Sequence, residues 1–326
     1  MTDAEAIAHA RTALQSGNDA AAEDIARQML GHDSANIDAA QLLALCLARR
    51  GAFADALPLF ERVVRGQPAN AGAHNNLANA LSSVGRHAEA VASFDAAIAL
   101  DPRAAVAHGN RGNALKALGR FDEALVSYGA AIALVPEHGR LRYNRGTTLM
   151  ELRRYADALA DLDHAVMLGP REPSYWLNRG SARFELHRFA DALADFDQSI
   201  ALAPGKARAH AFRASCLREL GRPDEALAAL ATTLSLDPAL PYILGEWAMQ
   251  KLACCDWRDL AGAIARLTRA IDRGERASTP FVLLALPTSR EQQRACARAF
   301  AASAAPAAAS IEWSRGGKLH DRLRIG

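Results

Sequence analysis

The sequence predicts an all-α fold, a right-handed superhelix (α-solenoid) of seven stacked helix hairpins with further capping helices after residue 240. Three observations predict it. Proline and alanine each recur every 34 residues, glycine keeps the same interval with two exceptions, and apolar residues stand at helical spacing on both sides of the glycine position. The proline column is Pro68, Pro102, Pro136, Pro170, Pro204 and Pro238. The alanine column is Ala22, Ala56, Ala90, Ala124, Ala158, Ala192 and Ala226.

The glycine column marks the turn between the two helices of each hairpin. It contains Gly17, Gly51, Gly85, Gly119 and Gly221, and Arg153 and His187 fill the two gaps. Glycine suits this place because it adopts the left-handed backbone of a helix C-cap without steric cost, and a proline just after the second helix prevents its continuation. A column of small residues falls where the helices of a hairpin cross, so we expect a close backbone approach at Ala10, Ala44, Ala78, Gly112, Gly146, Gly180 and Ala214.

These columns are those of the tetratricopeptide repeat, and the chain resembles that family over seven copies. The copies are 3-36, 37-70, 71-104, 105-138, 139-172, 173-206 and 207-240. One hairpin cannot bury its apolar face alone, so such units stack and form an extended binding surface.

The 34-residue phase ends at residue 240. Residues 241-302 keep helical spacing and predict transition or capping helices, with Asp256 as the N-cap of a helix over 257-273 and a capping box from Thr288 to Glu291. Residues 303-318 predict a linker. Residues 319-326 end in LRIG, which alternates like the start of a strand, and we interpret them as the first residues of a further domain.

The segments after residue 240 carry a finer resemblance. The order LACCDWRDL, ASTPFVLLALPTS, a short helix, a linker and HDRLRIG resembles the stretch between repeats and catalytic domain in bacterial members of the O-linked N-acetylglucosamine transferase and SPINDLY family. The resemblance implies a chain truncated at the start of the catalytic domain. It also implies a parent enzyme that transfers N-acetylglucosamine or fucose to Ser or Thr, from UDP-N-acetylglucosamine or GDP-fucose. Its catalytic and nucleotide-sugar residues would follow Gly326, so we assign no catalytic residue and no cofactor within this chain.

The candidate binding residues are asparagines on the first helix of each hairpin. Steps of 100° per residue place repeat positions 2, 5, 6, 9 and 13 on one side, which faces the groove of the superhelix. Position 6 supplies Asn76, Asn110, Asn144 and Asn178, and position 9 supplies Asn79 and Asn113. An asparagine amide is both donor and acceptor, so it can pair with the backbone of an extended peptide of any sequence. The family resemblance implies the same contact, and the alternative is that these are ordinary solvated asparagines.

Two further columns have structural interpretations. The arginines at position 7 are expected to cover apolar neighbours with their stems and to reach a carboxylate, rather than to contact a ligand. They are Arg111, Arg145, Arg179 and Arg213. The histidines at position 4 lie on the packing side a helix pair apart, so they cannot converge on one metal ion. They are His74, His108 and His210.

Composition narrows the function classes. The net charge of +2 and the absence of an apolar leader or of a membrane-length apolar run predict a cytoplasmic protein without nucleic-acid or membrane partners, and the odd number of five cysteines without a CxxC pair agrees with reduced thiols. We expect a protein-binding superhelix that recruits extended segments of protein substrates for a protein O-glycosyltransferase. The alternative is a free-standing adaptor that holds other proteins in the same groove. The sequence leaves the oligomeric state open, a homodimer included.

Overall fold

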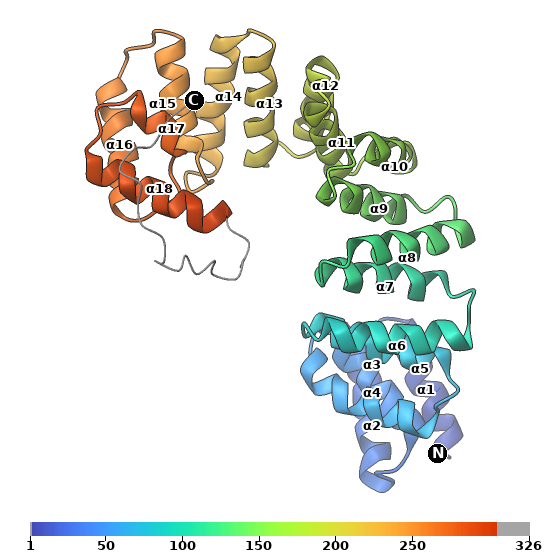
Figure 1. The fold of residues 1–326 in the computed structure, drawn as a ribbon. Coiled ribbons are helices and arrows are strands. Elements are labelled where there is room, and N and C mark those ends of the chain that lie inside the picture. The colour runs from blue at the N-terminus through green and yellow to red at the C-terminus, as the bar shows by residue number, and fades with distance from the viewer. Residues whose placement is uncertain (1, 305–326) are drawn as a thin grey trace, which may run out of the picture. The chain divides into compact units, whose positions relative to one another are not determined.

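The computed structural model describes residues 2–304, and the regular secondary structure in that range is entirely α-helical, which confirms the predicted fold class (Figure 1). The expected linker beyond residue 304 and the strand-like residues 319-326 lie outside the described residues. The helices belong to two compact units that divide between Pro204 and Gly205. The predicted domain limits at residues 240, 302 and 318 stay predictions.

The first unit contains six helix pairs. Within it, each helix packs on the next one along the chain. The first helices of the pairs are α1 (Asp3–Gln15), α3 (Ile37–Arg49), α5 (Ala71–Ser83), α7 (Ala105–Ala117), α9 (Gly139–Glu151) and α11 (Pro173–Glu185). The second helices are α2 (Asp19–His32), α4 (Phe53–Gly66), α6 (His87–Leu100), α8 (Phe121–Leu134), α10 (Tyr155–Leu168) and α12 (Phe189–Leu202).

The second unit begins with one more pair of the same length and continues with less regular helices. Its helices are α13 (Ala207–Glu219), α14 (Pro223–Leu236), α15 (Ile243–Ala253), α16 (Leu260–Asp272), α17 (Pro280–Leu284) and α18 (Arg290–Ala304). Helix α15 packs on α14, and α16 and α17 pack in turn on α15 and α18. Helix α14 is therefore covered by α15, which does not follow the 34-residue repeat.

Two predicted helix starts in this unit are wrong. Helix α16 begins after Asp259, and Asp256 instead accepts hydrogen bonds from Lys251 Nζ at 2.8 Å and from Arg258. Asp259 stands at the N-cap position with a left-handed backbone (φ 49°) and makes no side-chain capping hydrogen bond. The capping box of α18 lies one residue later than expected, between Ser289 and Gln292.

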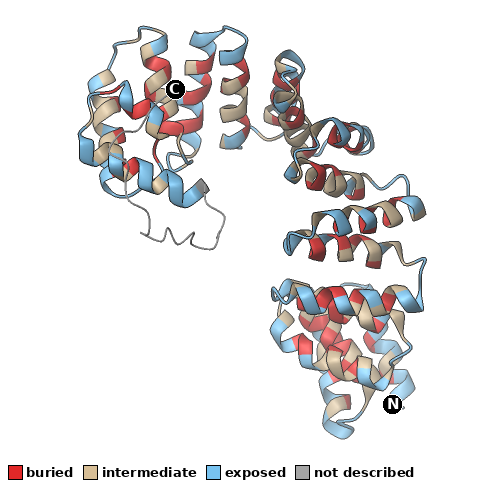
Figure 2. Cartoon of the chain, in the orientation of Figure 1, coloured by how far each residue is buried: buried red, intermediate tan, exposed pale blue. Residues whose placement is uncertain are grey.

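The column of small residues lies where the helices of each pair cross, as predicted. All seven members are buried, and in six of the seven repeats a large buried side chain stands sixteen residues later on the second helix (Figure 2). Those side chains are at most 2% exposed, and they are Phe60, Phe94, Tyr128, Leu162, Phe196 and Leu230. A Cβ atom added at Gly112 would lie 2.6 Å from the ring of Tyr128. The small residue is thus a steric requirement of the crossing.

The turn between paired helices has the left-handed backbone that the glycine column predicts. The five glycines have φ between +69° and +83°. Arg153 and His187, which fill the two gaps in the column, adopt the same conformation with φ of 56° and 58°. A residue with a Cβ atom pays about 1–2 kcal/mol for this conformation.

Replacing Arg153 with glycine should therefore stabilise the first unit. We expect a gain of about 1 kcal/mol, because the relief of left-handed strain exceeds the greater chain entropy that glycine gives to the unfolded state. Arg153 is exposed and makes no ion pair within the described residues, so the change removes little else. Urea unfolding followed by circular dichroism measures the effect. The reverse change, Gly119→Arg, should lower stability by a similar amount, and equal stability of all three proteins would contradict this explanation.

Position 4 of the repeat joins each proline to the following hairpin, a role that the sequence did not reveal. In four consecutive repeats a side-chain nitrogen at this position lies within hydrogen-bond distance of the carbonyl oxygen of the proline six residues earlier. The pairs are His74 Nε2 to Pro68 (2.9 Å), His108 Nε2 to Pro102 (3.0 Å), Arg142 Nε to Pro136 (3.2 Å) and Trp176 Nε1 to Pro170 (2.8 Å). From the third repeat on, position 4 carries a side chain with an N–H group, and His74 and His108 connect their repeats to the preceding ones.

Candidate peptide-binding groove

The predicted asparagines lie on four successive first helices, α5, α7, α9 and α11, and the structure links them to one another. Asn110 Nδ2 on α7 donates a hydrogen bond to Asn79 Oδ1 on α5 at 2.9 Å. Asn144 Nδ2 on α9 donates in the same way to Asn113 Oδ1 on α7, also at 2.9 Å. Position 6 of one repeat thus pairs with position 9 of the preceding repeat in two consecutive steps.

The outer members of the series are held differently. Asn178 Nδ2 on α11 donates to the hydroxyl of Tyr143 and to the carbonyl oxygen of Ser174, each at 2.9 Å. The side-chain amide of Asn76 on α5 has no hydrogen-bond partner within residues 2–304. The regular part of the series is therefore the stretch from α5 to α9.

A groove of about 350 Å³ lies between α7 and α9, and three of the six predicted asparagines line it. They are Asn110, Asn113 and Asn144. Its apolar wall includes Val106, which is 67% exposed. Gly109 leaves room for the side chain of Leu141, because a Cβ atom at position 109 would lie 2.7 Å from Leu141 Cδ2.

The hydrogen bonds between the asparagines fix which groups remain for a ligand. Asn79 and Asn113 use their Oδ1 atoms as acceptors, so their NH₂ groups stay available as donors. Asn110 and Asn144 use one N–H each, so their Oδ1 atoms stay available as acceptors. The buried Tyr128 adds to this order, because its hydroxyl donates to Asn113 Oδ1 at 2.7 Å. Burial raises the pKa of Tyr128, so the hydroxyl keeps its proton and its role as donor.

A lysine extends the polar line beyond the asparagines. Lys116 Nζ on α7 donates to Thr147 Oγ1 on α9 at 2.8 Å, and Thr147 occupies position 9 of its repeat. Burial lowers the pKa of Lys116, although the nearby charge of Glu151 opposes this shift. Connections between first helices thus continue after the last asparagine pair.

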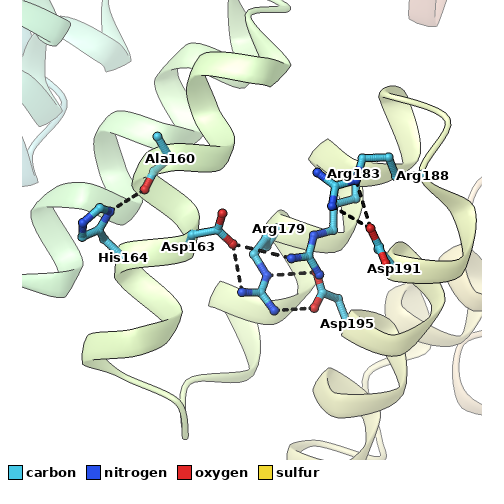
Figure 3. Close-up of polar contacts among 8 residues, drawn as sticks. All are labelled: Ala160, Asp163, His164, Arg179, Arg183, Arg188, Asp191 and Asp195. Carbon is cyan, nitrogen blue, oxygen red and sulfur yellow. Dashed lines mark hydrogen bonds and ion pairs between the residues drawn. The ribbon is translucent and has the colours of Figure 1, made fainter.

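Three of the four arginines of position 7 bind carboxylates, as the sequence predicts. Arg111 Nε donates to Asp95 at 2.6 Å, and Arg145 holds Asp161 with both Nε and Nη2 at 2.6 and 2.7 Å. Arg179 donates to Asp195 and also to Asp163 on the preceding second helix (Figure 3). These arginines stabilise the contacts between helices.

Residues 2–304 contain no cluster of His, Cys, Asp and Glu side chains that could hold a metal ion. The five cysteines are free thiols. No helix of this range combines the length and the apolar character that a membrane crossing needs.

Comparisons with known proteins agree with this architecture. The tetratricopeptide-repeat model matches residues 7–72, 49–105, 75–137, 110–173 and 177–241. No curated protein sequence is similar enough to match. Among solved structures, YrrB, described as a tetratricopeptide-repeat protein with an unusual peptide-binding site, is 26% identical, with a TM-score of 0.51 over 60% of this chain and 96% of its own.

Two less similar structures share the fold alone. PilF of Pseudomonas aeruginosa is 23% identical, with a TM-score of 0.55 over 64% of this chain and 94% of its own. The C-terminal part of a repeat protein from Cytophaga hutchinsonii is 18% identical, with a TM-score of 0.58 over 71% and 95%. The paired helices, the small-residue crossings and the family match together place the chain in the tetratricopeptide-repeat family.

Proposed function

We propose that the asparagine series on α5, α7, α9 and α11 binds extended segments of other proteins through their backbones. The observation that carries the proposal is the pair of asparagine links, Asn79 with Asn110 and Asn113 with Asn144, beside the groove between α7 and α9. Each link presents donors and an acceptor in a fixed arrangement. The similarity to YrrB, a repeat protein described with a peptide-binding site, supports the same function.

The spacing of the series suits an extended chain. Neighbouring packed helices lie about 8–10 Å apart, and an extended peptide advances about 3.3 Å per residue. Successive asparagine links would therefore meet about every third residue of the ligand. Backbone recognition leaves the intervening side chains free, so the groove can accept segments of differing sequence, Ser- and Thr-rich ones among them.

Simultaneous replacement of Asn76, Asn110, Asn144 and Asn178 by alanine should weaken the binding of extended Ser- and Thr-rich peptides. Each lost neutral hydrogen bond costs on the order of 1 kcal/mol, or about fivefold in affinity, so the four together should abolish measurable binding. Isothermal titration calorimetry measures the affinity, and circular dichroism confirms that the helices remain.

A chemical control separates backbone recognition from damage to the protein. The same peptide, methylated on alternate backbone nitrogens, is titrated into the unchanged protein. Methylation removes N–H donors from the ligand and leaves its side chains intact, so we expect binding to fall with the wild-type protein as well. Equal affinity for the methylated and unmethylated peptides would exclude the asparagine series as a reader of peptide backbone.

The finer proposal is that this scaffold recruits polypeptide substrates for a protein O-glycosyltransferase. Its support is the resemblance of the segments after residue 240 to the junction between repeats and catalytic domain in that family. A free-standing adaptor is equally compatible with the helix pairs and with the family match.

Sugar transfer distinguishes the two possibilities. The polypeptide that the whole gene encodes is incubated with UDP-N-acetylglucosamine or GDP-fucose and a Ser- and Thr-rich protein. Transfer that the asparagine variant loses would support recruitment for glycosylation. Absence of transfer with both donor sugars, together with normal peptide binding, would favour the adaptor.

A further inference from the structure

The position-7 arginines of two repeats share a pattern of hydrogen bonds that the repeat between them lacks. In the repeats of α7 and α11, the position-7 arginine bonds one residue sixteen positions later and one sixteen positions earlier. Arg111 bonds Ser127 and Asp95, and Arg179 bonds Asp195 and Asp163. The earlier partner is an aspartate on the preceding second helix, so each arginine joins two successive second helices.

The repeat between them lacks the second partner. Arg145 on α9 bonds Asp161 with Nε and Nη2, but sixteen positions earlier on α8 stands Gly129. A Cβ atom added at Gly129 would have only Arg145 Nη1 within 4 Å, at 3.9 Å. Arg145 Nη1 makes no hydrogen bond to any described residue. The guanidinium therefore keeps a free N–H edge at the place where the neighbouring repeats have a carboxylate.

Arg145 also lines a cavity of about 520 Å³ that lies between α8 and α10. Its lining includes Leu125 and Val126 of α8, Arg145 and Leu149 of α9, and Arg154 and Asp157 of α10. Val126 is 73% exposed and provides an aliphatic wall. The cavity is formed by α8, α9 and α10, and no asparagine of the peptide groove lines it.

The charged groups in and near the cavity are three arginines and two aspartates. Arg145 and Arg154 line the cavity and pair with Asp161 and Asp157, and Arg142, which is outside the lining, places its Nη1 at 3.7 Å from Asp161. The corresponding cluster of the next repeat is balanced, since Arg179, Arg183 and Arg188 face Asp163, Asp191 and Asp195 (Figure 3). Asp163 in that cluster is the counterpart of Gly129.

We propose that this cavity binds a carboxylate side chain of a partner protein, a glutamate or aspartate with an aliphatic residue next to it. The carboxylate would accept from Arg145 Nη1, in the place that Asp163 takes beside Arg179, and the aliphatic residue would pack on Val126. The site is distinct from the peptide groove, because none of the predicted asparagines lines it.

A pair of short peptides and one variant test the site. The probes are N-acetylated, C-amidated Val-Glu-Val and its uncharged twin Val-Gln-Val, titrated into the full chain while the side-chain Nε–H signal of Arg145 is followed by NMR. A charge-assisted hydrogen bond favours the glutamate peptide by about tenfold or more. We therefore expect a saturable shift with the glutamate peptide that the glutamine peptide does not produce at the same concentration.

The variant Gly129→Asp supplies the missing carboxylate from within the chain. Because only open space and Arg145 Nη1 lie near Gly129, the new side chain should fit, and an unchanged melting temperature verifies this. In this variant Arg145 should no longer respond to the glutamate peptide. In Gly129→Asn, which adds a side chain of similar size but no charge, Arg145 should still respond to the glutamate peptide. Equal responses to both peptides in the wild type, or an undiminished response in Gly129→Asp, would overturn the proposal.

Discussion

Asp195→Ala is expected to lower the free energy of unfolding of the first unit by about 3–5 kcal/mol, the usual cost of removing one member of a buried ion pair. The Asp195 side chain is only 1% exposed, and it accepts from Arg179 at 2.6 Å and from Arg183 at 2.9 Å. Those two arginines are themselves 12% and 17% exposed (Figure 3). Without the Asp195 carboxylate, the two largely buried guanidinium groups of Arg179 and Arg183 would have only Asp163 as a charged partner.

The same helix offers a matched control. Asp191 pairs with Arg188 at 2.7 Å, but both side chains are 50% exposed, so Asp191→Ala should cost less than about 1 kcal/mol. Urea unfolding of both variants, followed by circular dichroism, makes the comparison. Similar losses of unfolding free energy in the two variants would show that the burial of Asp195 does not determine how much its ion pairs stabilise the protein. Asp195→Asn should fall between them, because the amide keeps the shape and one acceptor while the charge is lost.

Periodic features of this fold were predictable from the sequence, because each is repeated and the repeats confirm one another. The small column, the left-handed turns and the arginine–carboxylate pairs are all of this kind. The hydrogen bond made by position 4 was not predicted, because His, Arg and Trp have no common property except a side-chain N–H. Only the structure shows that each of them reaches the proline carbonyl of the preceding repeat.

Features that depend on a single residue could not be predicted from the repeat pattern. The segment after residue 240 does not repeat, so nothing in the sequence indicates that Asp256 pairs with Lys251 and does not cap α16. The asparagines were identified as a group, but their mutual hydrogen bonds depend on the offset between adjacent first helices. Nothing in the sequence distinguishes Gly129, which becomes informative only through its place beside Arg145 Nη1.

Replacing Gly112 with valine is expected to destabilise the first unit by about 3 kcal/mol, the upper part of the range for overpacked cores. A Cβ atom at this position would lie 2.6 to 2.9 Å from three ring atoms of Tyr128, and that ring is fully buried between α7 and α8. The ring cannot turn aside without losing the hydrogen bond from its hydroxyl to Asn113 Oδ1. The same change should therefore also disorder the asparagine link between α7 and α9 and weaken peptide binding.

Gly129→Ala on the adjoining helix α8 provides the opposite case. Its new methyl group would enter open space, and alanine favours a helix over glycine by about 1 kcal/mol, so stability should rise. Chemical unfolding and peptide titration on both variants measure the two consequences together. If Gly112→Val kept the stability of the wild type, the close crossing of α7 and α8 would not require a small residue. If it lost stability but kept full peptide affinity, Tyr128 would not be the group that orients Asn113.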